Sequence, residues 1–596
     1  MHREETPVRP KRVLIIGGGP AGLITLRNLT KLGTFERVEL VERRDDVGGV
    51  WYLGAKDANS KWPSPAYPGL IGNVLPEFLS VHDFPFPPPD QYDPEHRKNL
   101  PFPTLTETYD YLRAFAKPFL EDGRIRLGQQ VVKVEETLIA DGSTKDKWLV
   151  LIRDWNDPVN PGVEREEKWD AIVGCTGWYD NLVWPETEGL DALREKKLAV
   201  HAKGWNGPEG LEGKRVLIIG NANSSNDIAS QLAPVAMTPI YRSIRRPNFP
   251  GFVSLPDERI ENVPPVKRYM LTNTDKVKVE LENGRIIDNI DIVFVGTGYK
   301  PHVDFVHVLP PPLDGVPNAN GTTTVPLMSL VGLNAPTTLD PSDSENANSK
   351  PALSSVLTNR IPLLHRHILY APSPSLAFIL SMAAYTPFTI ADVSSCWLAL
   401  AWSTGKGGEG VEYPKTLDER LKFERERMEA IEKGRREIQE RAQEKNDQRE
   451  KEKENATKAA DVREQHNTGG TTSETFSPSS SLIAAWQSGT NGHTPSALNL
   501  YSVLAVSEED YAQGLKEDVV KARPELGREQ KLWDQASASE SEGGSDNIYR
   551  HLPGGGLPEW NLERRKKREE MYPIKLASLK WAREKMGERW TNREGR

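Results

Sequence analysis

Residues 12–22, RVLIIGGGPAG, decide the fold of the first part of the chain. The apolar run RVLII predicts a short strand buried on both faces, and the segment LITLRNL that follows predicts a helix. Glycines between the two allow a tight turn, close approach of the backbone to a pyrophosphate, and close packing of the helix on the strand. The helix would then direct its N–H groups and its dipole at the phosphates. The turn residues predicted to contact these phosphates are Gly17, Gly19, Pro20, Ala21 and Gly22.

A carboxylate follows the next expected strand at the spacing of a dinucleotide site. Residues 38–41 predict this strand, and Glu42 comes 20 positions after Gly22. A carboxylate there accepts hydrogen bonds from ribose hydroxyls, which favours a nucleotide site over a glycine turn without a ligand. The sequence GGVW follows shortly afterwards. It either wraps over a flat ring system or forms an ordinary turn with a core tryptophan, and it contributes Gly49, Val50 and Trp51.

The sequence RVLII returns later in the chain and leads into GNANSSNDIA. Only the first glycine of the turn, Gly220, is kept. Ala222 and Ser225 stand in the places of the second and third, and both are small enough for close packing. Ser224 and Asn226 add short polar side chains at the expected helix start, where capping and phosphate contact both suit them. The pattern predicts a second dinucleotide site.

Arginine takes the place at this second site that Glu42 has at the first. Residues 238–241 predict a strand that ends at Arg242, with Arg245 and Arg246 close behind. A guanidinium group at this place pairs with a 2′-phosphate, which favours NADPH over NADH. The alternative is that these arginines form a basic surface turn. Two sites of different phosphate preference are most simply explained by one bound flavin and one exchangeable nicotinamide. The hydride would then pass from NADPH to FAD.

The composition excludes several other classes of protein. The 596 residues exceed one hydrophobic core, and a net charge of -9 gives no basic surface for nucleic acid. The two cysteines form no CxxC pair and no zinc spacing, which argues against a dithiol redox enzyme. The N-terminal residues contain no apolar stretch typical of a secretory signal. The most apolar windows are too short to cross a membrane, so a cytoplasmic protein without a transmembrane anchor is expected.

The motifs GGGPAG, GGVW, GNANSSNDIA and GTGYKP, together with Glu42, resemble those of flavin-containing monooxygenases, particularly fungal-like members. The resemblance runs from residue 11 to 405 and resumes at 498–589. It implies an α/β fold of two dinucleotide-binding, Rossmann-like domains, with the NADPH domain inserted in the FAD domain, plus a helical C-terminal extension. The expected boundaries are 1–180 and 301–410 for the FAD domain, 181–300 for the NADPH domain, 411–445 for a charged helix, 446–495 for a low-complexity insertion and 496–596 for the extension.

The resemblance also assigns individual residues. Asn73, in IGNVLPEFLSVHDFPFP, matches a family asparagine beside flavin and nicotinamide and is the candidate catalytic residue. Val131 matches the position whose backbone meets the adenine. Thr176 and Gly298 lie in segments that resemble the linkers between the two domains. From residue patterning alone, an apolar stripe within 416–445 predicts a helix docked on the body, consisting of Leu417, Leu421, Met428, Ile431 and Ile438.

The chain departs from the family at one signature. Glu195 and Lys197 stand where a phenylalanine and a glycine usually precede His201. Trp205 leans toward the related Baeyer–Villiger enzymes, whereas GGVW leans the other way. His201 either orients a loop at the domain junction, assists cofactor handling, or is hydrogen-bonded in a turn. The pair His365 and His367 has no clear third ligand, so no metal site is expected, and a structural or surface role is favoured.

The expected function is insertion of one oxygen atom of O2 into a small organic substrate through a C4a-(hydro)peroxyflavin, with N- or S-oxygenation favoured. A Baeyer–Villiger monooxygenase acting on a ketone is the first alternative. A non-catalytic nucleotide-binding scaffold, motivated by Ala222 and Ser225, is the second. The partners expected are FAD, NADPH, O2 and a small-molecule substrate, with no nucleic acid. The sequence leaves the oligomeric state open, a homodimer included.

Overall fold

A computed structural model describes most of the chain, and all structural statements below concern these residues. They are 7–54, 61–87, 98–138, 145–245, 253–310, 327–330, 360–403, 410–431, 433, 440, 504, 508–527 and 556–586. The insertion expected at 446–495, Ile438 and Arg246 lie outside them. Within the described residues, no helix is both long and apolar enough to cross a membrane.

The first sheet is built around β1 (Arg12–Ile16), which pairs in parallel with β2 and β7. Its strand order is β20-β21-β22-β7-β1-β2-β3. Branched apolar residues of β1 are buried on both faces, which is why the strand reads as an uninterrupted apolar run. The other strands are β2 (Arg37–Val41), β3 (Ile125–Arg126), β7 (Ala171–Gly174), β20 (Leu364–His365), β21 (Leu369–Tyr370) and β22 (Leu376–Phe378).

Helices pack on one face of this sheet. The helix α8 (Pro387–Trp402) is buried all round, because α1 (Pro20–Leu32) and α12 (Glu508–Ala522) both contact it. A helix that is buried on every side lies in a central layer. The helix α4 (Leu105–Glu121) begins with a capping box in which Thr104 and Glu107 bond each other's backbone. Two short elements, η1 (Gly49–Trp51) and α2 (Pro76–Leu79), complete this side.

A mostly antiparallel sheet of order β19-β18-β4-β5-β6 covers the other side of the first sheet. Its inward side chains, among them Trp148 and Trp169, share a hydrophobic cluster with β1 and β22. The strands are β4 (Gln129–Glu136), β5 (Trp148–Asp154), β6 (Val163–Trp169), β18 (Val306–Val308) and β19 (Met328–Ser329).

The second parallel sheet has the order β12-β11-β10-β16-β9 and repeats the arrangement of the first around β10 (Arg215–Ile219). The helix α6 (Asn223–Leu232) follows β10, and a three-stranded antiparallel sheet packs nearby. The remaining elements are α5 (Leu190–Glu195), β9 (Ala199–His201), η2 (Ala202–Gly204), β11 (Met237–Ser243), β12 (Ile260–Val263), β13 (Val266–Leu271), β14 (Val277–Leu281), β15 (Ile286–Ile290) and β16 (Ile292–Val295).

The chain passes from the first sheet to the second and back through two crossing segments. These segments pair as β8 (Asn181–Leu182) and β17 (Tyr299–Lys300), in antiparallel register. After β17 the chain returns to the first half with β18 and later with β20–β22. The prediction of an α/β fold with two Rossmann-like units is therefore confirmed.

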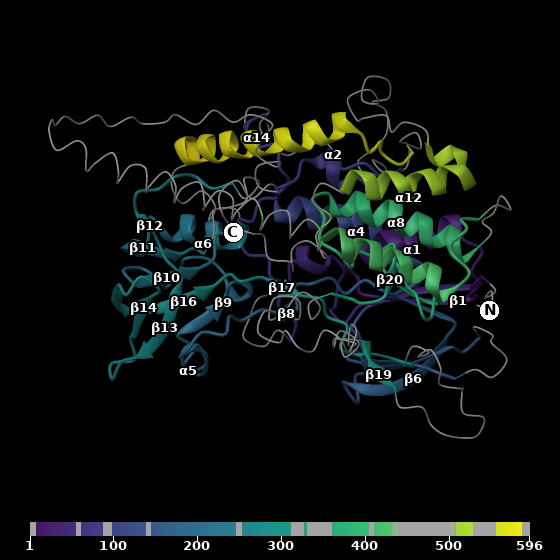
Figure 1. Ribbon diagram of the computed structural model, residues 1–596, viewed down its shortest axis with the longest axis horizontal. Helices are drawn as coiled ribbons and strands as arrows, with labels where there is room; N and C mark the ends of the chain where they lie inside the picture. The colour runs from purple at the N-terminus through teal and green to yellow at the C-terminus, as the bar shows by residue number, and fades with distance from the viewer. Residues whose placement is uncertain are drawn as a thin grey trace.

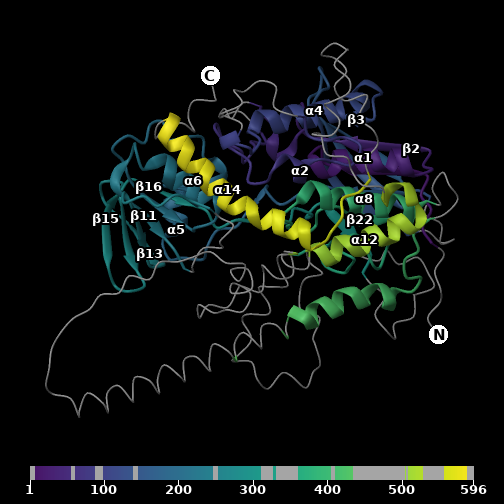
Figure 2. The ribbon, with the colours of Figure 1, turned by 90° about the horizontal axis from the view of Figure 1, so that it is seen from above.

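The C-terminal part lies across both halves. In Figure 1 the helix α14 (Leu562–Met586), in yellow, runs along the top of the molecule from the side of α12 to the side of α6. Figure 2 shows the same helix crossing diagonally above both sheets. The turn η6 (Pro524–Gly527) ends the α12 region.

The helical residues 417–431 dock differently from the prediction. Leu417, Leu421, Met428 and Ile431 are only half-buried. The buried positions are Arg420, whose Nε donates to the Ala371 carbonyl at 2.8 Å, and Glu424, which accepts from the Leu363 N–H at 2.9 Å. The helix is held by charged side chains that satisfy buried backbone groups, in addition to its apolar residues.

Candidate functional site

The first glycine turn connects β1 to α1 with almost no free space. Gly17 has φ +110°, a conformation that favours glycine. A Cβ on Gly17 would lie 2.8 Å from the Cys175 carbonyl oxygen, and one on Gly22 would lie 1.8 Å from the Gly17 carbonyl oxygen. Glycine at these two positions lets the helix start directly over the strand end. The N-cap residue, Gly19, makes no side-chain cap hydrogen bond, and the positive end of the α1 dipole lies at this turn.

Glu42 closes the side of this turn at the end of β2. Its Oε2 accepts a hydrogen bond from the Gly18 N–H at 2.6 Å, and its Oε1 accepts one from the Arg44 N–H at 2.9 Å. The carboxylate is buried. A carboxylate has about four acceptor positions, so both oxygens keep capacity for hydroxyl donors. The backbone contacts fix its orientation at the place where the sequence predicts a ribose.

The segment of Gly49, Val50 and Trp51 folds onto the same turn as η1. The Gly48 N–H donates to the Gly18 carbonyl at 2.9 Å, and a Cβ on Gly49 would lie 2.7 Å from Gly19 Cα. Trp51 is half-buried and packs against the main core cluster. The tryptophan packs against the core, as the second interpretation of GGVW expects, while the glycine pair brings backbone against the turn.

Three further predicted residues lie on other elements of the first half. Asn73 is exposed on the loop before α2. Val131 is half-buried on β4, opposite Ile152. Thr176 follows β7, and its Oγ1 donates to the His302 carbonyl at 2.8 Å, which ties one crossing segment to the other.

The second glycine turn connects β10 to α6 and uses serine where the first uses glycine. Gly220 has φ +105°. Ser225 is fully buried, and its Oγ donates to the Ile219 carbonyl at 3.2 Å. A Cβ on Gly296, which follows β16, would lie 2.1 Å from that Oγ. The hydroxyl therefore packs into space left by a glycine at a neighbouring strand end. Ser224 is half-buried in the first turn of α6.

Arg242 lies at the end of β11, beside the second turn. Its NH1 donates to Asn226 Oδ1 at 2.7 Å, and its Nε donates to Asn262 Oδ1 at 2.9 Å. Burial lowers the pKa of Arg242, yet the partners are neutral amides, so its charge has no carboxylate partner among these contacts. Asn226 is buried and orients the arginine. Sequence patterning placed Asn226 near phosphate but did not detect this role.

The two crossing segments meet at His201. Its Nδ1 accepts from the Lys203 N–H at 3.2 Å, and its Nε2 lies 3.2 Å from the Gly298 carbonyl oxygen. These partners require Nε2 to carry the proton, and burial lowers the pKa of His201 to about 4. The ring also contacts Tyr299 at 5.1 Å between centroids. His201 is therefore a neutral, hydrogen-bonded residue that orients the loop of Gly298 at the junction.

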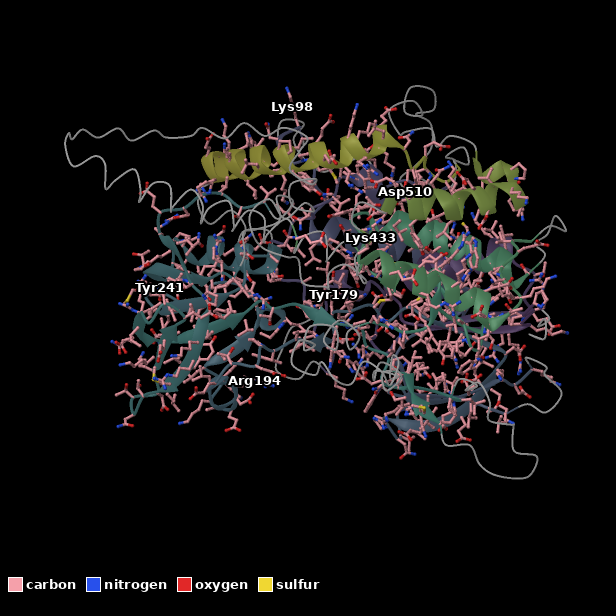
Figure 3. All side chains as sticks on the ribbon, in the orientation of Figure 1. Lys98, Tyr179, Arg194, Tyr241, Lys433 and Asp510 are labelled. Carbon is pink, nitrogen blue, oxygen red and sulfur yellow. The ribbon has the colours of Figure 1, made fainter. Side chains whose placement is uncertain are left out.

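Sequence patterning missed Asp180, which bridges the two halves. Asp180 pairs with Arg43, next to Glu42, and with Lys203 Nζ at 2.9 Å, next to β9. Burial opposes its ionisation, but the two cations outweigh burial and lower its pKa. Its neighbour Tyr179, labelled near the middle of Figure 3, lies at the junction between the two halves. An acidic residue in a linker gives no sequence signal of a bridge.

Other candidates have structural roles. Trp205 is buried in the second half, where its Nε1 donates to Gln231 Oε1 at 3.0 Å. His365 and His367 are buried against Phe423, which excludes the surface role considered for them.

One group of possible metal ligands, His82, Asp392 and Cys396, occurs in the described part of the chain. Asp392 already accepts from the His82 N–H at 2.8 Å and from Asn28 Nδ2 at 2.9 Å. Arg27 lies 3.1 Å from His82 Nδ1. A cation already stands beside this group, and its carboxylate is satisfied, so we assign it to the core that joins α1 to α8.

The comparisons with known proteins agree with this architecture. The family profile described as flavin-binding monooxygenase-like matches residues 10–246. The chain is 30% identical over 312 residues to the flavin-containing monooxygenase FMO GS-OX3 of Arabidopsis thaliana, covering 51% of this chain and 63% of that protein. It is 25% identical over 391 residues to the thiol-specific monooxygenase of Saccharomyces cerevisiae, covering 65% and 75%. The solved S-allyl-L-cysteine S-oxygenase of Allium sativum superposes with a TM-score of 0.52 at 18% identity, covering 94% and 98%.

Over part of its length the chain is similar to flavin-containing monooxygenases. The alignments span 63% of the length of FMO GS-OX3 and of FMO GS-OX2, a second Arabidopsis thaliana flavin-containing monooxygenase. The matched profile is that of flavin-binding proteins, which points to a flavin cofactor. The first turn fits the diphosphate of such a group, because the three glycines keep side chains off the helix N-terminus and Glu42 is fixed beside it.

Proposed function

We propose that this protein is an FAD-dependent monooxygenase that consumes NADPH and O2 and adds one oxygen atom to the sulfur or nitrogen of a small molecule. The observation that carries the proposal is the opposite chemistry of two equivalent strand ends. Glu42 follows β2 beside the first glycine turn, and Arg242 lies at the end of β11 beside the second. A carboxylate suits free ribose hydroxyls, whereas an arginine suits a 2′-phosphate.

The residues of each turn hold one cofactor. Gly17, Gly19 and Gly22, with the N-terminus of α1, would hold the FAD diphosphate, and Glu42 its ribose. Pro20 and Ala21 shape this helix start, while Gly49, Val50 and Trp51 cover it; Val131 and Thr176 lie on the flanking strand and linker.

Gly220 and the N-terminus of α6 would hold the NADPH diphosphate, with Ser224 at its edge and Arg242 on the 2′-phosphate. Ser225 and Asn226 are buried in the first turn of α6 and support this site. Gly298 lies in the segment by which the chain returns to the first half.

When bound, the two cofactors would supply hydride transfer and reductive activation of O2. The protein itself would position the cofactors and the substrate and shield them from water. Asn73 offers an exposed amide with both donor and acceptor atoms, suited to hydrogen-bond groups brought between the two turns. Burial raises the pKa of Cys175 to about 12, so this thiol stays protonated beside the first turn and is no nucleophile. The overall reaction converts NADPH, a proton, O2 and substrate into NADP+, water and the oxygenated product.

Sulfur is the favoured acceptor atom. The yeast relative is called a thiol-specific monooxygenase, and the alignment to it covers 75% of its length. Sulfur is a soft, polarisable nucleophile that needs little activation by protein side chains. This fits a site in which we assign no covalent catalyst.

Product analysis under labelled oxygen tests the proposal. Purified protein is supplied with NADPH, 18O2 and a panel of one thiol, one thioether, one tertiary amine and one ketone. We expect one labelled atom in the oxidised thiol, the sulfoxide or the N-oxide. A labelled ester from the ketone would establish the Baeyer–Villiger reaction instead. Colourless protein that leaves NADPH untouched would favour a nucleotide-binding scaffold, and NADPH consumption that yields only hydrogen peroxide would contradict oxygen transfer.

A further inference from the structure

The helix α14 lies outside the region matched by the family profile, yet it contacts the loop of Asn73. Two residues one helical turn apart make these contacts. Lys575 Nζ donates to the Gly72 carbonyl at 2.8 Å, and Met571 Sδ accepts from the Leu75 N–H at 3.3 Å. The backbone is therefore bound on both sides of Asn73, whose own side chain stays exposed.

Lys575 is buried, with 8% of its surface exposed. Its Nζ lies 4.7 Å from the centroid of the Phe102 ring, and Phe102 packs with Met571 in one small cluster. Burying an ammonium group is costly, and an apolar side chain of similar volume often stabilises such a place as well or better. A lysine here is thus poorly explained by stability alone.

The second half of the molecule faces the same lysine. Asp227, in the first turn of α6, attracts the Lys575 ammonium group: burial raises the pKa of Asp227 and lowers that of Lys575, and the attraction between the two charges partly offsets both shifts. Tyr67, which precedes the loop of Asn73, donates its hydroxyl to Asp227. Because Ser224 and Asn226 share that first turn, Lys575 stands between the loop of Asn73 and the second nucleotide site.

We propose that Lys575 is a positioning residue of the oxygenation site, which fixes the loop of Asn73 and sets its place relative to the first turn of α6. The helix α14 thereby completes a site whose nucleotide turns lie hundreds of residues earlier. The role given to Asn73 rests on the proposed function, whereas the anchoring of its loop does not. The contact at the far end of α14, Arg583 NH1 to the Pro256 carbonyl at 3.3 Å, holds the helix on the second half.

Hydrogen exchange tests the anchoring without any catalysis. We compare Lys575→Met with Lys580→Met, which removes the same charge from an exposed position of α14. In Lys575→Met, amides of residues 70–79 should exchange about tenfold faster, while β1 and β10 keep their protection. The control should match the wild type. Unchanged exchange in residues 70–79 would overturn the proposal. If Lys575→Met does not fold, Met571→Ala carries the same expectation for the Leu75 contact.

Anaerobic reduction of the bound flavin by saturating NADPH tests whether Lys575 acts through Asn73. Lys575→Met should slow this step about tenfold, because small displacements of positioning groups cost this much. In an Asn73→Ala background the same substitution should slow it no further. If the two substitutions together slow flavin reduction by the product of their separate factors, the proposal is overturned, because Lys575 then acts independently of Asn73. If wild-type protein does not reduce its flavin, the proposed function fails, and the exchange experiment still decides the anchoring.

Discussion

The two glycine turns follow the same strand sequence, RVLII, but they make room for their helices in different ways. At the first turn the helix gives up its side chain at Gly22, and Cys175 follows the neighbouring strand β7. At the second turn the helix keeps Ser225, and the residue after the neighbouring strand β16 is Gly296. A Cβ on Gly22 would meet the Gly17 carbonyl oxygen, whereas a Cβ on Gly296 would meet Ser225 Oγ, so at the second turn the strand end leaves the space that the helix residue fills. Loss of a motif glycine is therefore not by itself loss of the site, because close packing needs one small residue at the contact, on either side.

The largest effect is expected where the first turn has no space. Gly22→Ser puts a side chain where a Cβ would lie 1.8 Å from the Gly17 carbonyl oxygen, so the helix must move off the strand. We expect protein without flavin, or no folded protein, because such overpacking against backbone costs about 3 kcal/mol or more. The ratio of flavin to protein absorbance measures this. Gly514→Ala, in an open position of α12, should retain full flavin; flavin retention in Gly22→Ser would show that the turn is not a binding site.

The contact between Ser225 and Gly296 at the second turn predicts that one substitution restores the stability lost through the other. Gly296→Ala alone should destabilise the protein by about 2 kcal/mol, because its Cβ meets Ser225 Oγ at 2.1 Å. Adding Ser225→Gly should recover most of the lost stability, although it forfeits the hydrogen bond to Ile219. Thermal unfolding of the two single variants and the double variant measures this. Simple addition of the two losses would mean that these residues do not share the space.

A smaller effect is expected on the preference of the second site for NADPH over NADH. Arg242→Ala should raise the KM for NADPH about tenfold, because a charge-assisted contact to a 2′-phosphate is lost. The KM for NADH should change little. Steady-state kinetics with both nucleotides gives the ratio, with Arg245→Ala, an exposed neighbour, as the matched control. Equal losses for both nucleotides would place Arg242 away from the 2′-phosphate.

A pH-dependent effect is expected at Lys575, which lies between the two regions. Burial lowers its pKa to about 8 in the folded protein, from 10.5 when unfolded. Between these values the unfolded chain binds more protons, so Lys575 makes stability rise with pH from about 8 toward 10, by about 1 kcal/mol per pH unit at most. The difference in Tm between wild type and Lys575→Met should therefore shift in favour of wild type over this range. A constant difference would mean that the lysine keeps its ordinary pKa.

Local patterns were sufficient to predict the parts of the site that one strand and one helix build together. The turns of Gly17 and Gly220, and the placement of Glu42 and Arg242 at strand ends, follow from short-range spacing and from the geometry of parallel sheets. The same logic predicts the α/β fold. Local spacing does not show which cofactor atoms these residues contact, so the cofactor assignments remain predictions.

Contacts between distant segments could not be predicted. Ser225 and Gly296 each read as a weakened or ordinary position until β10 and β16 are seen side by side. Arg420 and Glu424 read as solvent-facing charges within a charged helix, and only the backbone groups they satisfy explain their burial. Asp180 and Lys575 are single charged residues whose partners come from other parts of the fold. Periodicity records local burial, whereas these roles depend on tertiary pairing.

The contact between Lys575 and Gly72 also bears on the order of synthesis. These residues are 503 positions apart in the chain. At ribosomal rates of about 5–20 residues per second, the loop of Asn73 exists for about 25–100 s before its anchoring helix is made. Both glycine turns can form during that time, so the nascent chain can acquire nucleotide-binding folds well before the residue proposed to catalyse oxygenation is held in place. A ribosome that stalls late would leave a protein with both turns and a loose loop between them.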